Sequence, residues 1–399
     1  MVNTEGFDPV IAAAIAGARE GVLDSPRSAV ARGRMGMVLL AHQVHPEARA
    51  CFTQAATFEP RNPRWSYFLG LAQLPDAPAA AVTNLDRAVR LFPENESAPR
   101  LRLADTLLDL GRVDEAEAQY QHVRQREPNS GAAALGLGKA ANARDRTKEA
   151  ADFLAAAMSD PGTRRAAHRL LITVNQRLGR TNEAEQLSRT LADVPKDQPA
   201  DPFLHEVDQL KTGEQAWLDQ ADEWINAGRM PEATKLLQKA VQTYPKSDRA
   251  MFFLGRALSR LGDAAGAETI LTRAVQLAPG SVEAQMQLGS LLLSRGRTKQ
   301  AQGCFRAALK AKPNLGEAWF NLGLTLGGTA NRAESMEAFR EAIRFKPDLI
   351  EAYLGLAVSL RADGQPQATI HELRRALDLN PEEPLRRKLL DQLKLAGQP

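Results

Sequence analysis

The chain has 399 residues, of which 25% are charged and only 5% are aromatic, and its formal net charge at pH 7 is +3. So small a net charge gives no electrostatic reason to expect a nucleic acid or a membrane surface as partner. The length is large for one compact core, so we expect several packing units in series.

Residues 1–28 precede any repeated pattern. Asp8 followed by Pro9 predicts a helix start, because aspartate caps free backbone N–H groups and proline fits the first turn. The alanine-rich stretch 10–23 then predicts a single capping helix. No basic segment precedes the apolar run 10–16, so a signal peptide is not indicated, although a leader or anchor removed before residue 1 stays an open alternative.

Five similar segments follow, at about 29–62, 63–95, 97–130, 131–164 and 165–198. Each predicts two amphipathic helices, since apolar residues recur at spacings of three and four on both sides of a turn. The fifth segment is the least regular, because Ile172 stands where the others have glycine or alanine. We interpret residues 29–198 as a first array of helical hairpins.

The pattern breaks at residues 199–213. Pro195, Pro199 and Pro202 lie too close together for a helix. Asp201 and Pro202 then predict a new helix that ends at Gly213, with one apolar face formed by Phe203, Leu204, Val207 and Leu210. This short amphipathic insertion either covers apolar surface at the junction between two arrays or acts as a hinge or a self-docking segment.

Residues 214–383 repeat with an exact period of 34. Counted from the first residue of each copy, position 8 is glycine or alanine, positions 20 and 27 are small, and position 15 is glycine in four copies. Small residues let two antiparallel helices pack closely, and glycine ends a helix in the left-handed conformation. Such a period indicates a stacked repeat. Each copy ends in a proline, at Pro245, Pro279, Pro313, Pro347 and Pro381.

The last segment, residues 384–399, carries leucines four residues apart and basic residues on the opposite face. Leu385, Leu389 and Leu393 would lie against the last repeat. This arrangement is typical of a terminal capping helix, which is apolar inward and charged outward.

The copy at 316–349 shows the pattern most fully, in Trp319, Leu322, Gly323, Leu326, Ser335, Phe339, Ala342 and Pro347. This order of a bulky residue, Leu-Gly, small residues, Phe, Ala and Pro resembles the tetratricopeptide repeat family. Position 11, usually aromatic in that family, is aliphatic in most copies here. The resemblance implies an all-α right-handed solenoid of about ten helical hairpins with capping helices at both ends.

The resemblance also implies that the first helices of successive hairpins line a concave groove, which binds peptide segments of partner proteins. Candidate groove residues in the second array are Arg249, Phe252, Arg256, Arg260, Met286, Ser290, Phe320, Asn321, Leu324 and Arg361. Those in the first array are Tyr67, Leu101, Asp105, Lys139 and Arg169.

Two features of this candidate set leave alternatives open. The three arginines of copy 248–281 share a helix face, so they would hold an acidic or phosphorylated segment, or else lie in solvent. Phe252 and Phe320 would serve either as anchors for a partner or as packing between helices.

The sequence shows no catalytic arrangement, and we expect neither enzymatic activity nor a cofactor. His42, His45 and Cys51 lie near one another in the sequence, but their spacing is not that of a structural zinc site. Cys51 and Cys304 fall in repeats far apart, which predicts free thiols in a reducing compartment. No stretch approaches the ~20 apolar residues of a membrane helix. We therefore expect a cytoplasmic location.

These features favour a non-enzymatic scaffold or adaptor that binds protein segments. An accessory subunit of an enzyme or of a secretion or assembly complex, acting through its convex surface or its caps, is the alternative. An RNA-binding solenoid is less favoured because the net charge is small and aromatic residues are few. The sequence does not indicate an oligomeric state.

Overall fold

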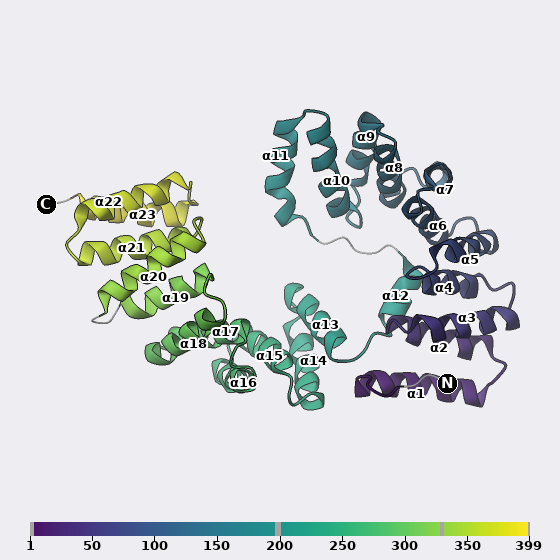
Figure 1. Cartoon of the computed structure of the whole chain (residues 1–399), viewed down its shortest axis with the longest axis horizontal. Coiled ribbons are helices and arrows are strands. Elements are labelled where there is room, and N and C mark those ends of the chain that lie inside the picture. Colours follow the sequence, from purple (N-terminus) through teal and green to yellow (C-terminus); the bar gives the residue numbers. More distant parts are fainter. Residues whose placement is uncertain (1–3, 196–200, 328–330, 398–399) are drawn as a thin grey trace. The chain divides into compact units, whose positions relative to one another are not determined.

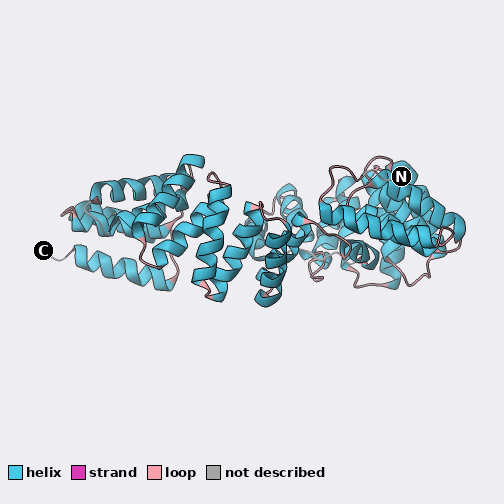
Figure 2. Ribbon diagram, turned by 90° about the horizontal axis from the view of Figure 1, so that it is seen from below, coloured by secondary structure: helices cyan, strands magenta, loops and turns pink. Residues whose placement is uncertain are grey.

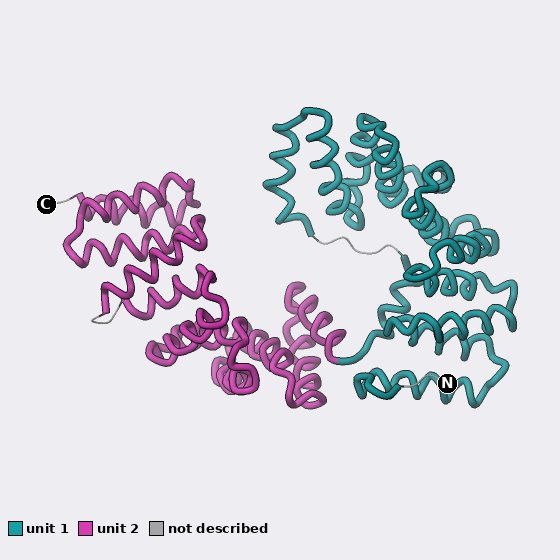
Figure 3. The backbone as a smooth tube through the Cα atoms, in the orientation of Figure 1, with its two compact units in different colours: residues 1–213 teal, residues 214–399 magenta. Residues whose placement is uncertain are grey.

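The structure, a computed structural model, describes residues 4–195, 201–327 and 331–397. Within these ranges all regular structure is helical and no strand occurs, so the predicted all-α solenoid is confirmed (Figure 2). The chain divides into two compact units, Met1–Gly213 and Glu214–Pro399 (Figure 3). We describe each unit separately.

The first unit contains an N-terminal helix, five hairpins and one further short helix (Figure 1). Asp8 caps the first helix as predicted, because its carboxylate accepts from the backbone N–H of Val10 at 2.8 Å. The hairpins pair consecutive helices, from α2 with α3 to α10 with α11. The helices are α1 (Pro9–Asp24), α2 (Ala29–Ala41), α3 (His45–Phe58), α4 (Pro63–Gln73), α5 (Pro78–Leu91), α6 (Ala98–Asp109), α7 (Val113–Arg126), α8 (Gly131–Ala143), α9 (Thr147–Ala157), α10 (Arg164–Arg177), α11 (Thr181–Thr190), a 3-10 turn (Leu191–Asp193) and α12 (Pro202–Asp208).

The second unit contains five hairpins and a C-terminal helix. In that helix Leu389 is fully buried and Leu393 packs against the last hairpin, which agrees with the predicted apolar stripe. The hairpins run from α13 with α14 to α21 with α22. The helices are α13 (Glu214–Asn226), α14 (Met230–Thr243), α15 (Asp248–Leu261), α16 (Ala264–Leu277), α17 (Val282–Ser294), α18 (Thr298–Ala311), α19 (Gly316–Gly327), α20 (Arg332–Phe345), α21 (Ile350–Ala362), α22 (Pro366–Asp378) and α23 (Glu383–Ala396).

Hairpins with glycine at position 8 are held by a close contact between this glycine and the bulky side chain at or next to position 24. A Cβ atom added at Gly289 would lie 2.7 Å from the ring of Phe305, and one at Gly323 equally close to Phe339. Such distances are far inside van der Waals contact, so a larger side chain at position 8 would force the helices apart. The alanines at position 27 of all five copies in the second unit are fully buried, as the spacing predicts.

The turn between the two helices of a hairpin requires a left-handed residue at position 15. Gly228, Gly262, Gly296 and Gly364 have φ between 71° and 83°, which confirms the predicted helix end. The equivalent Ala330 lies outside the described residues. Gln43 and Asp145 of the first unit, by contrast, adopt the same conformation with φ of 61° and 58° although they carry side chains.

The residue Gln43 therefore offers a test of this turn. Changing Gln43 to Gly removes a Cβ atom from the left-handed region and is expected to raise the free energy of unfolding by about 1 kcal/mol. Urea unfolding followed by circular dichroism measures this change. The matched Gly262→Ala variant, whose added Cβ meets no atom within 4 Å, is expected to lose about the same amount. A destabilised Gln43→Gly protein would contradict the interpretation.

Candidate protein-binding faces

We call the side of each unit formed by the first helices of its hairpins the first-helix face. In the first unit it is formed by α2, α4, α6, α8 and α10. The short helix α12 packs on this face against α2 and α4 (Figure 1). Phe203 and Val207 of α12 are buried in the same apolar cluster as Tyr67 and Phe68 of α4. The amphipathic insertion is therefore part of the first unit.

An aromatic cluster surrounds Phe203. Its ring centroid lies 5.0 Å from that of Phe92, 5.3 Å from that of Tyr67 and 6.4 Å from that of Phe68. The guanidinium of Arg64 lies 5.6 Å from the Phe68 ring and 5.9 Å from the Phe203 ring. Aromatic contacts of this kind add to the gain from burying the ring area.

Two carboxylates of the α12 segment meet polar groups of the first-helix face. Asp201 uses one oxygen to cap α12, accepting from the backbone N–H of Phe203 at 3.0 Å. Its other oxygen accepts from the hydroxyl of Tyr67 and lies 3.5 Å from Nη2 of Arg102. Further along α12, the Glu206 carboxylate accepts hydrogen bonds from both terminal nitrogens of Arg64, which forms a two-point ion pair.

Tyr67, a candidate groove residue, is completely buried and contacts Asp201 and Phe203 of the α12 segment. Burial, followed by the charge of Asp201, raises the pKa of Tyr67 well above its ordinary value. The phenol therefore stays protonated and serves as a hydrogen-bond donor to the carboxylate. Arg64, Phe68 and Arg102 are site residues beyond the predicted set, although Arg64 and Arg102 occupy positions 2 and 6 of their repeats.

The other candidates of the first unit are not gathered into one cluster. Leu101 is half-buried and packs against the apolar cluster below α12. Asp105 accepts a 2.6 Å hydrogen bond from the hydroxyl of Tyr120, so it supports the neighbouring helix. Lys139, half-buried, lines a cavity of about 110 Å³ between α8, α9 and α10, whereas Arg169 is exposed.

In the second unit the first-helix face carries a row of partly exposed apolar side chains. Phe252, Met286 and Phe320 are half-buried, and each also packs on a core cluster, so they contribute to both packing and surface. Leu324 and Val358, at position 9 of consecutive repeats, are 44% and 40% exposed. Ser290 precedes them at the same position and is exposed, while Asn321 is half-buried beside the row.

The three arginines of α15 differ in their partners. Arg249 donates a hydrogen bond to Gln215 of α13 at 2.8 Å. Arg256 forms an ion pair with Asp222, which also belongs to α13. Both pairs join the same repeat position in consecutive copies. The guanidinium of Arg256 also lies 4.7 Å from the ring centroid of Phe253. Arg260 and Arg361 are exposed, and within the described ranges neither has a hydrogen-bond or ion-pair partner.

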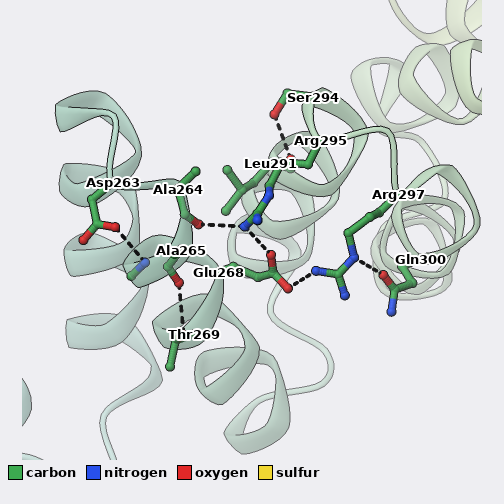
Figure 4. Close-up of polar contacts among 11 residues, drawn as sticks. Asp263, Ala264, Ala265, Glu268, Thr269, Leu291, Ser294, Arg295, Arg297 and Gln300 are labelled. Atoms are coloured by element: carbon green, nitrogen blue, oxygen red, sulfur yellow. Dashed lines mark hydrogen bonds and ion pairs between the residues drawn. The ribbon is translucent and has the colours of Figure 1, made fainter.

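A polar contact outside the predicted set joins successive hairpins. Glu268 of α16 lies between Arg295, which follows α17, and Arg297, which precedes α18 (Figure 4). Its Oε2 atom is 2.7 Å from Nη1 of Arg295. The carboxylate thus holds the turn of the next hairpin against the second helix of the preceding one.

The first unit contains the same arrangement. Glu117 of α7 lies 2.6 Å from Nη2 of Arg146 and 3.5 Å from Nη1 of Arg144. In both units the glutamate occupies position 21 of one repeat and the arginines occupy positions 14 and 16 of the next. A search for charges that recur one repeat apart would have found this pattern.

We expect Glu268→Ala to lower the free energy of unfolding by about 1 kcal/mol, because it removes a half-buried carboxylate that two exposed arginines share. Urea unfolding at low and high salt measures the loss. The matched control is Glu337→Ala in α20, where an exposed glutamate pairs with Arg340 of the same helix. That control is expected to cost less than about 0.5 kcal/mol, and equal losses in the two variants would refute the inter-hairpin role.

The remaining candidates concern metal and thiol chemistry. Within the described residues no group of three or more His, Cys, Asp or Glu side chains is arranged to hold a metal ion. Cys51 and Cys304 are buried free thiols, and burial raises the pKa of each. Burial likewise lowers the pKa of His42. Across the same residues, no helix combines the length and the apolar character needed to cross a bilayer.

Comparison with known families confirms the resemblance. Three family models, each described as Tetratricopeptide repeat, match residues 34–96, 101–162 and 218–282, residues 260–322, and residues 316–349. Together they span more than half of the chain. The protein belongs to the tetratricopeptide repeat family, and this membership supports a general role as a protein-interaction scaffold.

Individual relatives add little beyond the fold. No curated protein matches the sequence. Among solved structures, MamA is 22% identical, with 40% of this chain and 94% of that chain covered and a TM-score of 0.39. MamA from Desulfovibrio magneticus RS-1 is 21% identical, with 42% of this chain and 94% of that chain covered and a TM-score of 0.39. YrrB, described as a TPR protein with an unusual peptide-binding site, is 18% identical. The match covers 49% of this chain and 100% of that chain, with a TM-score of 0.41.

Proposed function

We propose that the protein is a non-enzymatic scaffold that binds a segment of a partner protein on the first-helix face of its second unit. The observation that carries this proposal is the apolar row on α15, α17, α19 and α21. Side chains there remain partly exposed above the buried core clusters of the unit. Aromatic and methionine side chains of this kind are enriched in protein interfaces, and the exposed leucine and valine beside them extend the apolar surface.

The composition of this face changes along the unit, which bears on the partner. Near α13 and α15 it is charged, and the pairs Arg249–Gln215 and Arg256–Asp222 already use two of its arginines. Near α19 and α21 it is apolar, with Leu324 most exposed. An acidic partner segment would therefore pair with Arg260, while its apolar side chains would lie along the row.

The glutamates at position 2 lie beside the same row. Glu283, Glu317 and Glu351 lie in the first turns of α17, α19 and α21. A carboxylate there also stabilises the helix, because it interacts favourably with the positive end of the helix dipole. Glu317 is paired with Lys346, while Glu283 and Glu351 are exposed. These charges favour a partner segment whose ends differ in charge, with its acidic part toward Arg260.

The test changes the apolar row without touching the core. Leu324→Asp places a charge among apolar anchors, and we expect at least a tenfold loss of affinity, about 1.4 kcal/mol or more. The partner is first identified by co-purification with the wild-type chain and mass spectrometry. Its affinity for purified wild-type and variant proteins is then measured by calorimetry.

The matched control is Leu277→Asp at the end of α16. Leu277 is 47% exposed, close to the exposure of Leu324, but it lies on a second helix away from the apolar row. We expect this variant to bind like the wild type. Equal binding by all three proteins would remove the second unit's first-helix face as the binding site.

A further inference from the structure

The helix α12 contacts residues at three of the repeat positions that face outward on the first-helix face of the first unit. Arg64 and Tyr67 stand at positions 2 and 5 of one repeat, and Arg102 stands at position 6 of the next. All three contact the α12 segment. Because the segment that covers this face belongs to the chain itself, its side chains show which chemical groups the face can bind.

Three anchors hold the α12 segment at fixed spacings. The Asp201 carboxylate is buried against Tyr67 and Arg102, the Phe203 ring lies two residues later in the aromatic cluster, and the Glu206 carboxylate follows three residues further on. Each anchor meets groups of matching chemistry: a phenol and a guanidinium, three aromatic rings, and a second guanidinium in two-point contact. Such complementarity goes beyond the covering of apolar surface.

The hairpins beneath α12 have the same close contacts between their two helices as the hairpins of the second unit, which within its described residues carries no such helix on its first-helix face. A Cβ atom added at Gly36 of α2 would lie 2.7 Å from the Phe52 ring, and one at Gly70 of α4 would lie 2.8 Å from Leu85, the same close contacts that hold the hairpins of the second unit. The α12 segment has no counterpart in the repeat pattern. Its outer anchor is open to water, since the side chains of Arg64 and Glu206 are 34% and 41% exposed.

We propose that the first-helix face of the first unit is a binding site for a short amphipathic helix of a partner protein, and that α12 is a built-in occupant which this partner helix displaces. The partner helix carries a carboxylate at its start, an aromatic residue two positions later and a second carboxylate three positions after that. An unbound protein thus keeps its first site closed. The proposal rests on the first unit alone and is independent of the apolar row on the second.

The polar anchors explain why the occupant would be exchanged for a segment of the same chemistry. A segment that replaced α12 would again shield the Tyr67 hydroxyl and the Arg102 guanidinium from water, and burying them without a carboxylate partner is unfavourable. A purely apolar segment would not restore these contacts. The tethered α12 competes at an effective concentration of about millimolar, so the partner must bind more strongly or be locally concentrated.

The first experiment measures binding of a probe to an opened site. The probe is a fluorescent synthetic peptide of residues 201–211, and the protein is the full chain carrying Phe203→Ala and Glu206→Ala. We expect saturable binding measured by fluorescence anisotropy, at least tenfold tighter than binding to the wild-type chain. Adding Tyr67→Phe, which removes only the hydroxyl, is expected to weaken binding about tenfold. A peptide with Phe203→Ala is the negative control.

The second experiment uses the wild-type chain, so its result does not depend on whether a variant of the protein folds. An excess of the peptide carrying His205→Ala, which changes an exposed residue and distinguishes its mass, is added before hydrogen exchange. We expect amides 203–210 of the protein to exchange faster with peptide present, while those of α4 and α6 do not.

Three outcomes would overturn the proposal. The first is absence of peptide binding to the opened chain when its circular dichroism equals that of the wild type. The second is a hydrogen-exchange rate of amides 203–210 that does not change when the peptide is added and that equals the rate of α4. That result would make α12 a permanent element of the core. The third is a dimer by light scattering that exchanges α12 between copies, which would assign the site to self-association.

Discussion

The close approach of two helices within each hairpin is the constraint on which the rest of the structure depends. In nine of the ten hairpins it is met by glycine or alanine at position 8, in most of them together with small residues at positions 20 and 27, and α10–α11, with Ile172 at position 8, is the exception. With the hairpins fixed in this way, the first helices of a unit lie side by side and present one continuous face. A solenoid of this kind binds partners with helix surfaces, and its loops serve mainly to turn the chain.

The two units use this face differently. In the first, the chain's own helix α12 covers it through an aromatic cluster and two carboxylate anchors. In the second, the apolar row around Phe320 and Leu324 remains partly exposed. Because stability in stacked repeats is a sum of local contacts, a binding face can be occupied or left open without altering the fold beneath it.

The sequence predicted the hairpins well because their signals are local and repeated. Glycines at position 15, such as Gly262, fix the turns, and alanines at position 27 mark the buried helix face. Inter-hairpin contacts were harder to foresee. The partners of Glu268 lie one repeat ahead, and those of Asp201 lie about a hundred residues or more away in the sequence. No periodic pattern links Phe203 to Phe92, so only the folded chain reveals that cluster. The candidate binding residues themselves stay predictions.

One feature of the first unit has a mechanical consequence. The helix α11 buries only Ala184 among its ten residues, whereas α8 in the middle of the unit buries nine. In a stack where each hairpin leans only on its neighbours, a helix with so little buried surface opens at a small fraction of the global unfolding free energy. Thermal fraying and proteolytic nicking of the first unit would therefore begin at α11 and advance toward α10, while the hairpins nearer α1 stay intact.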